Sequence, residues 1–418
     1  MNKIFEQVRA LCVAAAAAAP ALALTDNDTR NRALLAMADA LLAEKEIILA
    51  ANDRDLQNAE KNGVPKVMHD RLRLTGARVE AVAEAIRAVT LLPDPLRGAE
   101  QTQRPSGIRI IKKAVPLGVI AIIYEACPNV TADAAALCIK SGNTVILRGG
   151  KEAIESNRAI VSALKNALIA VGLSPDAIGL VEITDRESAN ALMQMRGLVD
   201  VLIPRGGKAL IRSCVENAKV PVIETGAGNC HVYIDRAADL DMALEVTVNA
   251  KCQRPSVCNA AETLLLHKDV AAAFLPRFFE ATRAWQLELR GDARACALLP
   301  QISPATEEDF ATEYNDYIMA VKVVDNTEDA VAHIARYTTK HSECIITADQ
   351  VAADYFLGMV DAAAVYHNAS TRFTDGGEFG LGAEIGISTQ KLHARGPMGL
   401  EALTTVKYLV SGNGTVRK

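Results

Sequence analysis

Residues 118–148 read GVIAIIYEACPNVTADAAALCIKSGNTVILR. In this stretch an unbroken apolar run at 119–123 precedes a segment with helical spacing at 131–140, and a second apolar run follows at 144–147. Short apolar strands that alternate with helices are typical of a parallel sheet with helices on both faces. The stretch therefore predicts a doubly wound α/β fold.

The same alternation continues to residue 223, with helices predicted at 152–171, 186–195 and 208–217 and strands at 178–183, 199–203 and 220–223. A second α/β pattern begins near residue 229, with strands predicted at 262–266, 318–324, 343–347 and 362–366. We therefore expect one domain at 1–228, a second at 229–392 and a C-terminal segment at 393–418. The strand-like residues 403–410 of that segment either dock on another subunit or close a sheet within their own.

Composition excludes several classes of protein. The chain has 418 residues, of which 50% are hydrophobic and 23% charged, and its net charge is −5. This composition is that of a globular protein, and no long block of Lys and Arg marks a nucleic-acid or membrane surface.

An Ala-rich run at 10–24 follows Lys3 and Arg9 and resembles a secretory leader. Because alanine is the best helix former, we favour a helix that is kept, followed by a second helix capped at 25–28.

The nine cysteines are odd in number and irregular in spacing, and no Cys-x2-Cys pair occurs. This pattern favours reduced thiols in the cytosol over a disulfide framework or a metal site. Cys258 lies in a polar, cationic stretch at 251–259, an environment that lowers the pKa of a thiol and favours a reactive thiolate. Cys252 is the competing candidate, and a buried structural cysteine is the plain alternative for each.

Gly206 and Gly207 follow a predicted strand and open a predicted helix. Free N–H groups at such a turn can hold a phosphate, although two glycines also make an ordinary turn. The standard Gly-x-Gly-x-x-Gly and Walker A motifs for nucleotide binding are absent from the sequence.

Several long segments resemble the gamma-glutamyl phosphate reductases, a family of the aldehyde dehydrogenase superfamily. They occur in order along essentially the whole chain, at 115–131, 203–207, 253–259, 368–391 and 396–405. The resemblance implies an aldehyde-dehydrogenase-like fold, with a cofactor domain at 1–228, a catalytic domain at 229–392 and an oligomerisation segment at 393–418. It also implies NADPH-dependent reduction of L-glutamyl 5-phosphate to L-glutamate 5-semialdehyde and phosphate, in proline biosynthesis. A cytoplasmic homo-oligomer is expected, with glutamate 5-kinase as a candidate partner and no metal, nucleic acid or membrane.

The resemblance also assigns roles to single residues. Cys258 matches the nucleophile that forms a thioester with the substrate. Asn129 matches the side chain that, with the backbone N–H of Cys258, stabilises the oxyanion. The alternative role of Asn129 is that of a helix N-cap.

For the cofactor, Arg148 matches a cation near the adenosine ribose, Gly206 and Gly207 match the glycine turn beside the pyrophosphate, and Glu313 matches a carboxylate on the nicotinamide ribose. Ser370 and Arg372 lie in a segment similar to the substrate-recognition loop. The alternative for both Glu313 and Arg372 is a side chain on the protein surface that binds neither cofactor nor substrate.

The sequence departs from the family at two cysteines, since Cys127 stands where Arg is usual and Cys252 where Thr is common. Glu224 aligns with the general base of hydrolytic relatives, and its role stays open. One rival reading is therefore a hydrolytic NAD-dependent aldehyde dehydrogenase. Two others are a cofactor-free thiol acyltransferase, for which no histidine lies in a suitable motif, and a noncatalytic binding protein.

Overall fold

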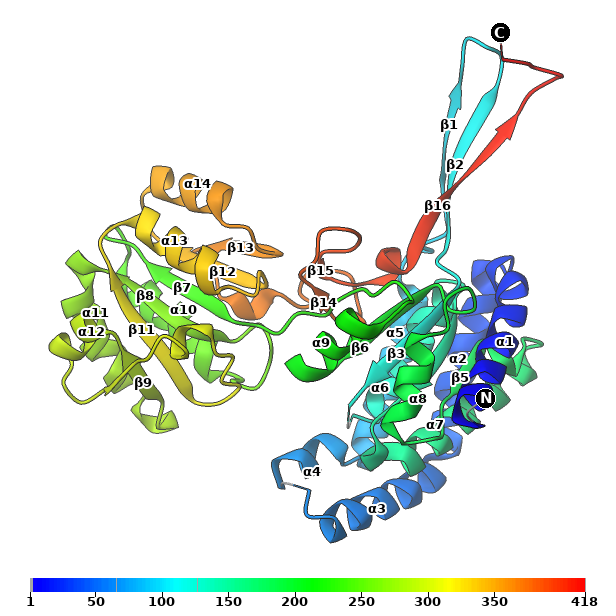
Figure 1. Ribbon diagram of the computed structural model, residues 1–418, viewed down its shortest axis with the longest axis horizontal. Coiled ribbons are helices and arrows are strands. Elements are labelled where there is room, and N and C mark those ends of the chain that lie inside the picture. Colours follow the sequence, from blue (N-terminus) through cyan, green and yellow to red (C-terminus); the bar gives the residue numbers. More distant parts are fainter. Residues whose placement is uncertain (1–2, 65, 126, 418) are drawn as a thin grey trace. The chain divides into compact units, whose positions relative to one another are not determined.

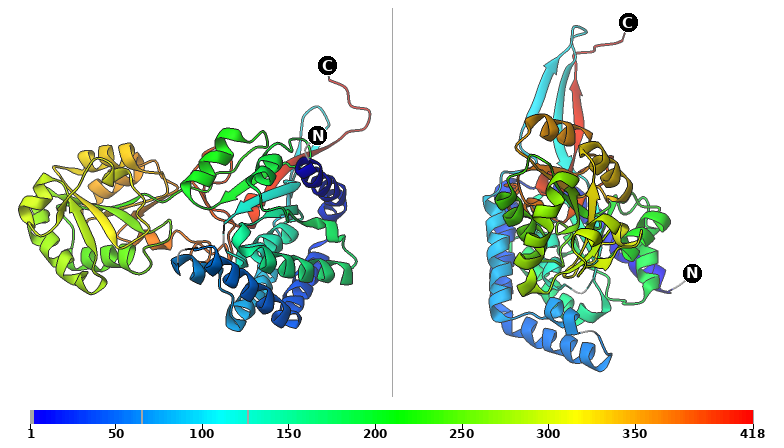
Figure 2. Two further views of the ribbon diagram at one scale, coloured as in Figure 1. Left: turned by 60° about the horizontal axis from the view of Figure 1, so that its bottom comes forward. Right: turned by 90° about the vertical axis from the view of Figure 1, so that its left-hand side faces the viewer.

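The computed structural model describes residues 3–64, 66–125 and 127–417 and divides the chain into two compact units (Figures 1 and 2). Unit 1 contains the chain up to Glu224 together with residues 380–386 and 398–418. Unit 2 contains residues 225–379 and 387–397.

The central sheet of unit 1 is parallel and has the strand order β5-β4-β3-β6. The strands β3 (Val119–Tyr124), β4 (Thr144–Arg148) and β6 (Val201–Arg205) are almost wholly buried, as their unbroken apolar runs predict, and β5 (Ile178–Leu180) is short. The chain passes from β3 outward to β5 and then returns to place β6 on the other side of β3. This reversal makes the edge beyond the carboxyl ends of β3 and β6 the topological switch point, where ligands of such sheets bind.

Helices cover both faces of this sheet. Between and after the strands run α6 (Asn129–Lys140), α7 (Ile154–Ala170), α8 (Arg186–Met193) and α9 (Lys208–Asn217). The preceding part of the chain is helical, with α1 (Lys3–Ala23), α2 (Asn27–Ala43), α3 (Lys45–Lys61), α4 (Lys66–Leu72) and α5 (Gly76–Leu91). By length and composition α1 could cross a membrane, yet Val8, Cys12 and Ala15 on one of its faces pack into the core formed with β3, β4 and α8. The two predicted N-terminal helices are present as α1 and α2, and Asp26, within the predicted cap at 25–28, is the N-cap of α2.

A separate antiparallel sheet belongs to unit 1, with the order β1-β2-β16. Its strands are β1 (Ala99–Gln103), β2 (Arg109–Pro116) and β16 (Thr404–Ser411), which extend from the helices as a ribbon (Figure 1). The C-terminal strand therefore pairs with β2 of its own chain, from Thr404 opposite Pro116 to Ser411 opposite Arg109. β16 is an edge strand that exposes Val406, Tyr408 and Val410.

Unit 2 is built on a parallel sheet of seven strands in the order β10-β9-β11-β8-β7-β12-β13. Their bounds are β7 (Cys230–Ile234), β8 (Ala261–His267), β9 (Glu288–Gly291), β10 (Ser303–Pro304), β11 (Ile318–Val324), β12 (Ser342–Ile346) and β13 (Ala364–His367). The helices α10 (Leu240–Cys252), α11 (Lys268–Ala281) and α12 (Ala293–Leu298) pack with one apolar core. A second core contains side chains of α13 (Thr327–Tyr337) and α14 (Gln350–Met359). A short pair, β14 (Ile387–Ser388) and β15 (Gly396–Pro397), completes the unit.

The structure divides the chain differently from the predicted domains. Residues 380–386, expected in the second domain, belong to unit 1, because Gly382 packs against Leu92 and the backbone of Ile385 bonds that of Met398. Residues 393–397 belong to unit 2 rather than to the C-terminal segment. The predicted strand at 220–223 is reduced to one bridge, from Leu202 to Val222.

An ion pair lies in the interior of unit 2. Lys251 in the last turn of α10 and Glu262 in β8 are both fully buried and bonded to each other. Burial raises the pKa of Glu262, and Lys251 opposes that rise. Glu262 also accepts the backbone N–H of Asn315 at 3.2 Å. The pair ties α10, which leads into the segment of Cys258, to the centre of the sheet.

We predict that Lys251→Met destabilises unit 2 by about 3–5 kcal/mol at pH 8, because a buried carboxylate is left without a countercharge. The loss is smaller at pH 5: the raised pKa means that the folded state binds a proton on Glu262 more tightly, and the neutral acid needs no partner. Urea unfolding followed by fluorescence of Trp285, the only tryptophan, measures both values. The double variant Lys251→Met/Glu262→Gln recovers most of the stability, and an equal loss at both pH values would contradict this account.

Candidate active site

Cys258 lies between α10 and β8 and is half-buried. Its carbonyl oxygen accepts the S–H of Cys230, the first residue of β7, with a sulfur–oxygen distance of 3.2 Å. Burial raises the pKa of Cys230 well above its usual range, so this thiol keeps the proton that it donates. The backbone of Cys258 is thereby anchored to a central strand while its own thiol stays accessible.

The main chain of Gly228 packs directly on the backbone of Cys258. A Cβ atom at Gly228 would lie 1.4 Å from the Cys258 carbonyl oxygen, so only glycine fits at this position. The N–H of Gly228 donates to the carboxylate of Glu313 at 2.7 Å. Glu313, predicted to hold the nicotinamide ribose, thus bonds the glycine that supports the candidate nucleophile.

Arg372 lies beside this segment, in the short helix η5 (Thr371–Phe373). Its Nε donates to Oε1 of Gln253 at 3.0 Å, and its Nη1 donates to Oδ1 of Asn259. Burial lowers the pKa of Arg372, the neighbouring Arg254 lowers it further, and Cys258 raises it by attraction. A guanidinium stays charged despite such shifts, so a cation lies within electrostatic reach of the Cys258 thiolate.

Ser370 is used locally. It is buried, and its Oγ accepts the N–H of Arg372 at 3.3 Å as the N-cap of η5. Ser370 therefore has a structural role, because it caps the turn that carries Arg372. Its contact with substrate stays a prediction.

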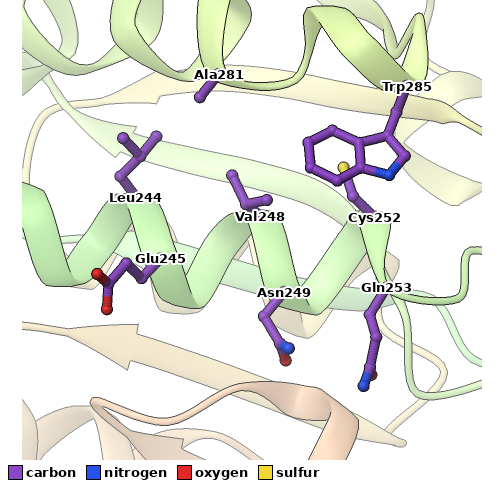
Figure 3. A pocket seen from close by; sticks show the side chains of 8 residues that line it. All are labelled: Leu244, Glu245, Val248, Asn249, Cys252, Gln253, Ala281 and Trp285. Atoms are coloured by element: carbon purple, nitrogen blue, oxygen red, sulfur yellow. The ribbon is translucent and has the colours of Figure 1, made fainter.

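Cys252 differs from Cys258 in its surroundings. Figure 3 shows its side chain pointing from α10 toward Trp285, whereas Gln253 points from the opposite side of the helix. It lines an apolar pocket of about 500 Å³ with Leu244, Val248 and Trp285. Cys252 is 2% exposed, and burial raises its pKa to about 11. A thiol with this pKa is protonated near pH 7 and is a poor nucleophile.

In unit 1, Asn129 is the first residue of α6 and is exposed. The N-cap position belongs to Pro128, so the alternative role of Asn129 as an N-cap was wrong. Its Nδ2 lies 3.5 Å from Oδ2 of Asp133, one turn further along the helix. A bond of this length is weak, which leaves the amide available to another acceptor.

Arg148 ends β4, and its Nη2 donates to the carbonyl oxygens of Thr184 and Asp185 at 2.8 and 3.2 Å. Its Nη1 makes no hydrogen bond to a described residue. The guanidinium therefore holds the loop before α8 and keeps one donor group for a ligand.

Gly206 and Gly207 join β6 to α9 at the topological switch point of the sheet. The N–H of Gly207 donates to Oε2 of Glu125 at 3.1 Å. Glu125 follows β3, and a Cβ at Gly206 would lie within 2.8 Å of its carboxylate. The turn therefore already bonds one oxyanion, the carboxylate of Glu125.

The family model for the aldehyde dehydrogenase family matches residues 4–318. The chain belongs to the aldehyde dehydrogenase family. A gamma-glutamyl phosphate reductase of Clostridium acetobutylicum is 56% identical over 402 residues, covering 96% of each chain. The corresponding enzyme of Enterococcus faecalis is 57% identical over 397 residues, or 95% of each chain.

Solved structures extend this result to the fold. The crystal structure of gamma-glutamyl phosphate reductase from Thermotoga maritima superposes with a TM-score of 0.96 at 44% identity, covering 99% of this chain and 100% of that one. An acetylating aldehyde dehydrogenase from Geobacillus thermoglucosidasius shares the fold at 16% identity, with a TM-score of 0.71 over 100% and 98% of the two chains. The predicted aldehyde-dehydrogenase-like fold is confirmed.

Within this aldehyde dehydrogenase family chain, the predicted site residues fall into two groups. Unit 2 carries Cys258, Glu313, Ser370 and Arg372, which are linked through Gly228, Gln253 and Asn259. Unit 1 carries Asn129, Arg148 and the two glycines, at the carboxyl ends of its strands.

Sequence reasoning missed Gly228, Gln253, Asn259 and Arg254 as functional residues. A signal existed for three of them, because they lie within five residues of Cys258 in the cationic stretch that singled out this cysteine. No sequence signal separates Gly228 from Gly226 in the same loop, since its constraint comes from a residue thirty positions away.

We predict that Gly228→Ala lowers kcat at least about 100-fold, because the added methyl group displaces the backbone of Cys258, and a shift of about 1 Å at a reacting group has this effect. Steady-state kinetics and thermal unfolding of the variant measure activity and folding separately. Gly358→Ala in α14 is the control, since no atom lies within 4 Å of its added Cβ. A Gly228→Ala enzyme with unchanged kcat would refute the positioning role.

Proposed function

We propose that this chain reduces L-glutamyl 5-phosphate with NADPH, giving L-glutamate 5-semialdehyde, phosphate and NADP, in proline biosynthesis. The observation that carries the proposal is the half-buried Cys258 beside the cation Arg372, in a chain 56% identical to a gamma-glutamyl phosphate reductase. An acyl phosphate is an electrophile with negative charge, so it matches a thiolate next to a guanidinium.

In the first half of the reaction the Cys258 sulfur attacks the acyl carbon. A carbon–sulfur bond forms, the bond between that carbon and the phosphate oxygen breaks, and phosphate leaves with both electrons. The backbone N–H of Cys258 is proposed as one donor to the developing oxyanion, and the contacts of its backbone with Cys230 and Gly228 support a fixed position for this segment. Asn129 is proposed as the side-chain donor to the same oxygen, on the strength of its match to the family.

In the second half, bound NADPH supplies the hydride that the thioester carbon accepts. The carbon–sulfur bond then breaks, the aldehyde leaves, and Cys258 returns as a thiolate that Arg372 stabilises. We propose that Arg148 and the turn at Gly206–Gly207 hold the phosphate groups of the cofactor, because a donor of Arg148 remains open and the turn already bonds a carboxylate. Glu313 is retained as a candidate for the nicotinamide ribose, in addition to its bond to Gly228.

We further propose that the enzyme is a cytoplasmic homo-oligomer with glutamate 5-kinase as a candidate partner. The apolar side chains exposed on the edge strand β16 support an association between copies. None of the nine cysteines, all of which the structure describes, is joined in a disulfide, which suits a reducing compartment.

We predict that Cys258→Ser abolishes turnover with freshly generated glutamyl phosphate but still binds NADPH, whereas Cys252→Ser stays active. The reason is that the Cys252 thiol is protonated and faces an apolar pocket. NADPH oxidation at 340 nm and cofactor fluorescence measure the two properties. An equal loss of activity in both variants would mean that the nucleophile is misassigned.

The effect of added phosphate on NADPH formation distinguishes the proposed reductase from a hydrolytic aldehyde dehydrogenase. With the semialdehyde and NADP, the proposed enzyme forms NADPH only when phosphate is added, because phosphate releases the acyl group from Cys258. A hydrolytic enzyme that used Glu224 to activate water would form NADPH at the same rate without phosphate.

A further inference from the structure

We propose that Gln253 and Asn259 form a neutral amide clamp, which positions Arg372 as an unpaired cation for an oxyanion group of the substrate. The proposal rests on the function proposed above and identifies two positioning residues that hold the substrate-recognition arginine. Among the described residues, no carboxylate lies within ion-pair distance of Arg372, and the two side-chain acceptors that fix its guanidinium are uncharged.

Asn259 uses its whole side chain for this purpose. Its Nδ2 donates to the carbonyl oxygens of Arg372 and Thr374 at 3.2 and 2.9 Å, and its Oδ1 accepts from Nη1 of Arg372. The carbonyl oxygen of Asn259 accepts the hydroxyl of Thr371 at 2.7 Å. Because Asn259 is 5% exposed and directly follows Cys258 in the chain, these bonds fix the arginine relative to the candidate nucleophile.

The clamped loop is rigid on its far side as well. The hydroxyl of Thr374 bonds Oγ of Ser342 at 2.6 Å and the hydroxyl of Tyr366 at 2.7 Å, so it is tied to β12 and β13. A side chain held in one rotamer loses little entropy when a ligand binds, which is the advantage of a preorganised site.

Gln253 completes the clamp from the C-terminal end of α10. Its Oε1 accepts from Nε of Arg372, and both residues line a pocket of about 290 Å³ with Asn249, Phe373, Asp375 and Glu378. Asp375 is committed to its own turn, where Oδ1 accepts the N–H groups of Gly377 and Glu378 at 2.8 and 3.4 Å. Asp375 attracts the guanidinium without forming an ion pair with it, and Nη2 of Arg372, which makes no hydrogen bond to a described residue, stays available to a ligand.

Neutral acceptors suit this task because a carboxylate at either position would form an ion pair with Arg372. The arginine would then be held equally well, but its charge would be neutralised before substrate arrived. Arg254 is exposed and close enough to act on Arg372, so a second cation adds to the attraction. The ligand group is an oxyanion, which in the proposed substrate is either the phosphate or the α-carboxylate.

Gln253→Glu and Gln253→Met test the clamp, with Gln301→Glu as a matched charge control at an exposed position. The reverse reaction is used, and the KM values for phosphate and for the semialdehyde are measured separately at saturating NADP. We expect Gln253→Glu to raise at least one KM about tenfold, equivalent to about 1.4 kcal/mol, with kcat within about threefold of wild type. Gln253→Met, which loses the hydrogen bond but adds no charge, should raise the same KM less.

A larger increase in KM for Gln253→Glu than for Gln253→Met separates the clamp from a purely structural role. Glutamate keeps the hydrogen-bond acceptor for Arg372, whereas methionine removes it, so a structural role would make Gln253→Met the more damaging change. A larger effect for phosphate assigns Arg372 to the phosphate, and a larger effect for the semialdehyde assigns it to the carboxylate; either supports the clamp. Unchanged KM values in Gln253→Glu, or a greater defect in Gln253→Met, would overturn it. If wild type and Gln301→Glu form no phosphate-dependent NADPH at all, the proposed function itself fails and the clamp loses its substrate.

Discussion

The main chain of Gly228 lies against the carbonyl group of Cys258 with no space for a methyl group between them. This close approach brings the loop before β7 onto the segment before β8, two neighbouring strands of one parallel sheet. The carboxylate of Glu313 accepts the N–H of Gly228, and the Cys230 thiol donates to the carbonyl oxygen of Cys258. The position of the candidate nucleophile is therefore set by the packing of its backbone.

The distribution of charge around the thiol follows from this arrangement. The two nearby arginines act on the segment of Cys258, while the acceptors that hold Arg372 are amides. Cys252 is only six residues earlier, yet its side chain points from the end of α10 into apolar surroundings that favour its protonated form (Figure 3). Two thiols close in sequence thus lie in different surroundings, one in an apolar pocket and the other near two arginines.

Sequence analysis predicted those parts of the fold that depend on local pattern. The apolar run at 119–123 and the run at 318–324 became buried strands, and α9 has the predicted bounds 208–217. The run at 220–223 failed because it lies beyond the edge strand β6 and makes only one bridge. β2 was missed because residues on both of its faces are half-buried, so it lacks the alternation of buried and exposed residues that marks a strand with one buried face.

The candidate site was predictable where chemistry resides in one residue, as in Cys258 and Arg372, and through resemblance to a family. The contacts that position these groups join residues far apart in sequence: Asn259 with 372–374 and Gly228 with Cys258 and Glu313. Neither hydrophobic period nor motif spacing encodes such contacts, because they arise only when strands order themselves in the sheet. This is why the amide clamp emerged from the structure.

The claim that Cys258 accepts the acyl group can be tested by trapping the thioester. The enzyme is mixed with freshly generated glutamyl phosphate in the absence of NADPH and quenched in acid, which keeps the substrate amine protonated and prevents its attack on the thioester. Peptide mass spectrometry then locates the modification. We predict one glutamyl group on the peptide that contains Cys258 and its loss when NADPH is added before the quench. A glutamyl group on Cys252, or no covalent adduct at any cysteine, would contradict this mechanism.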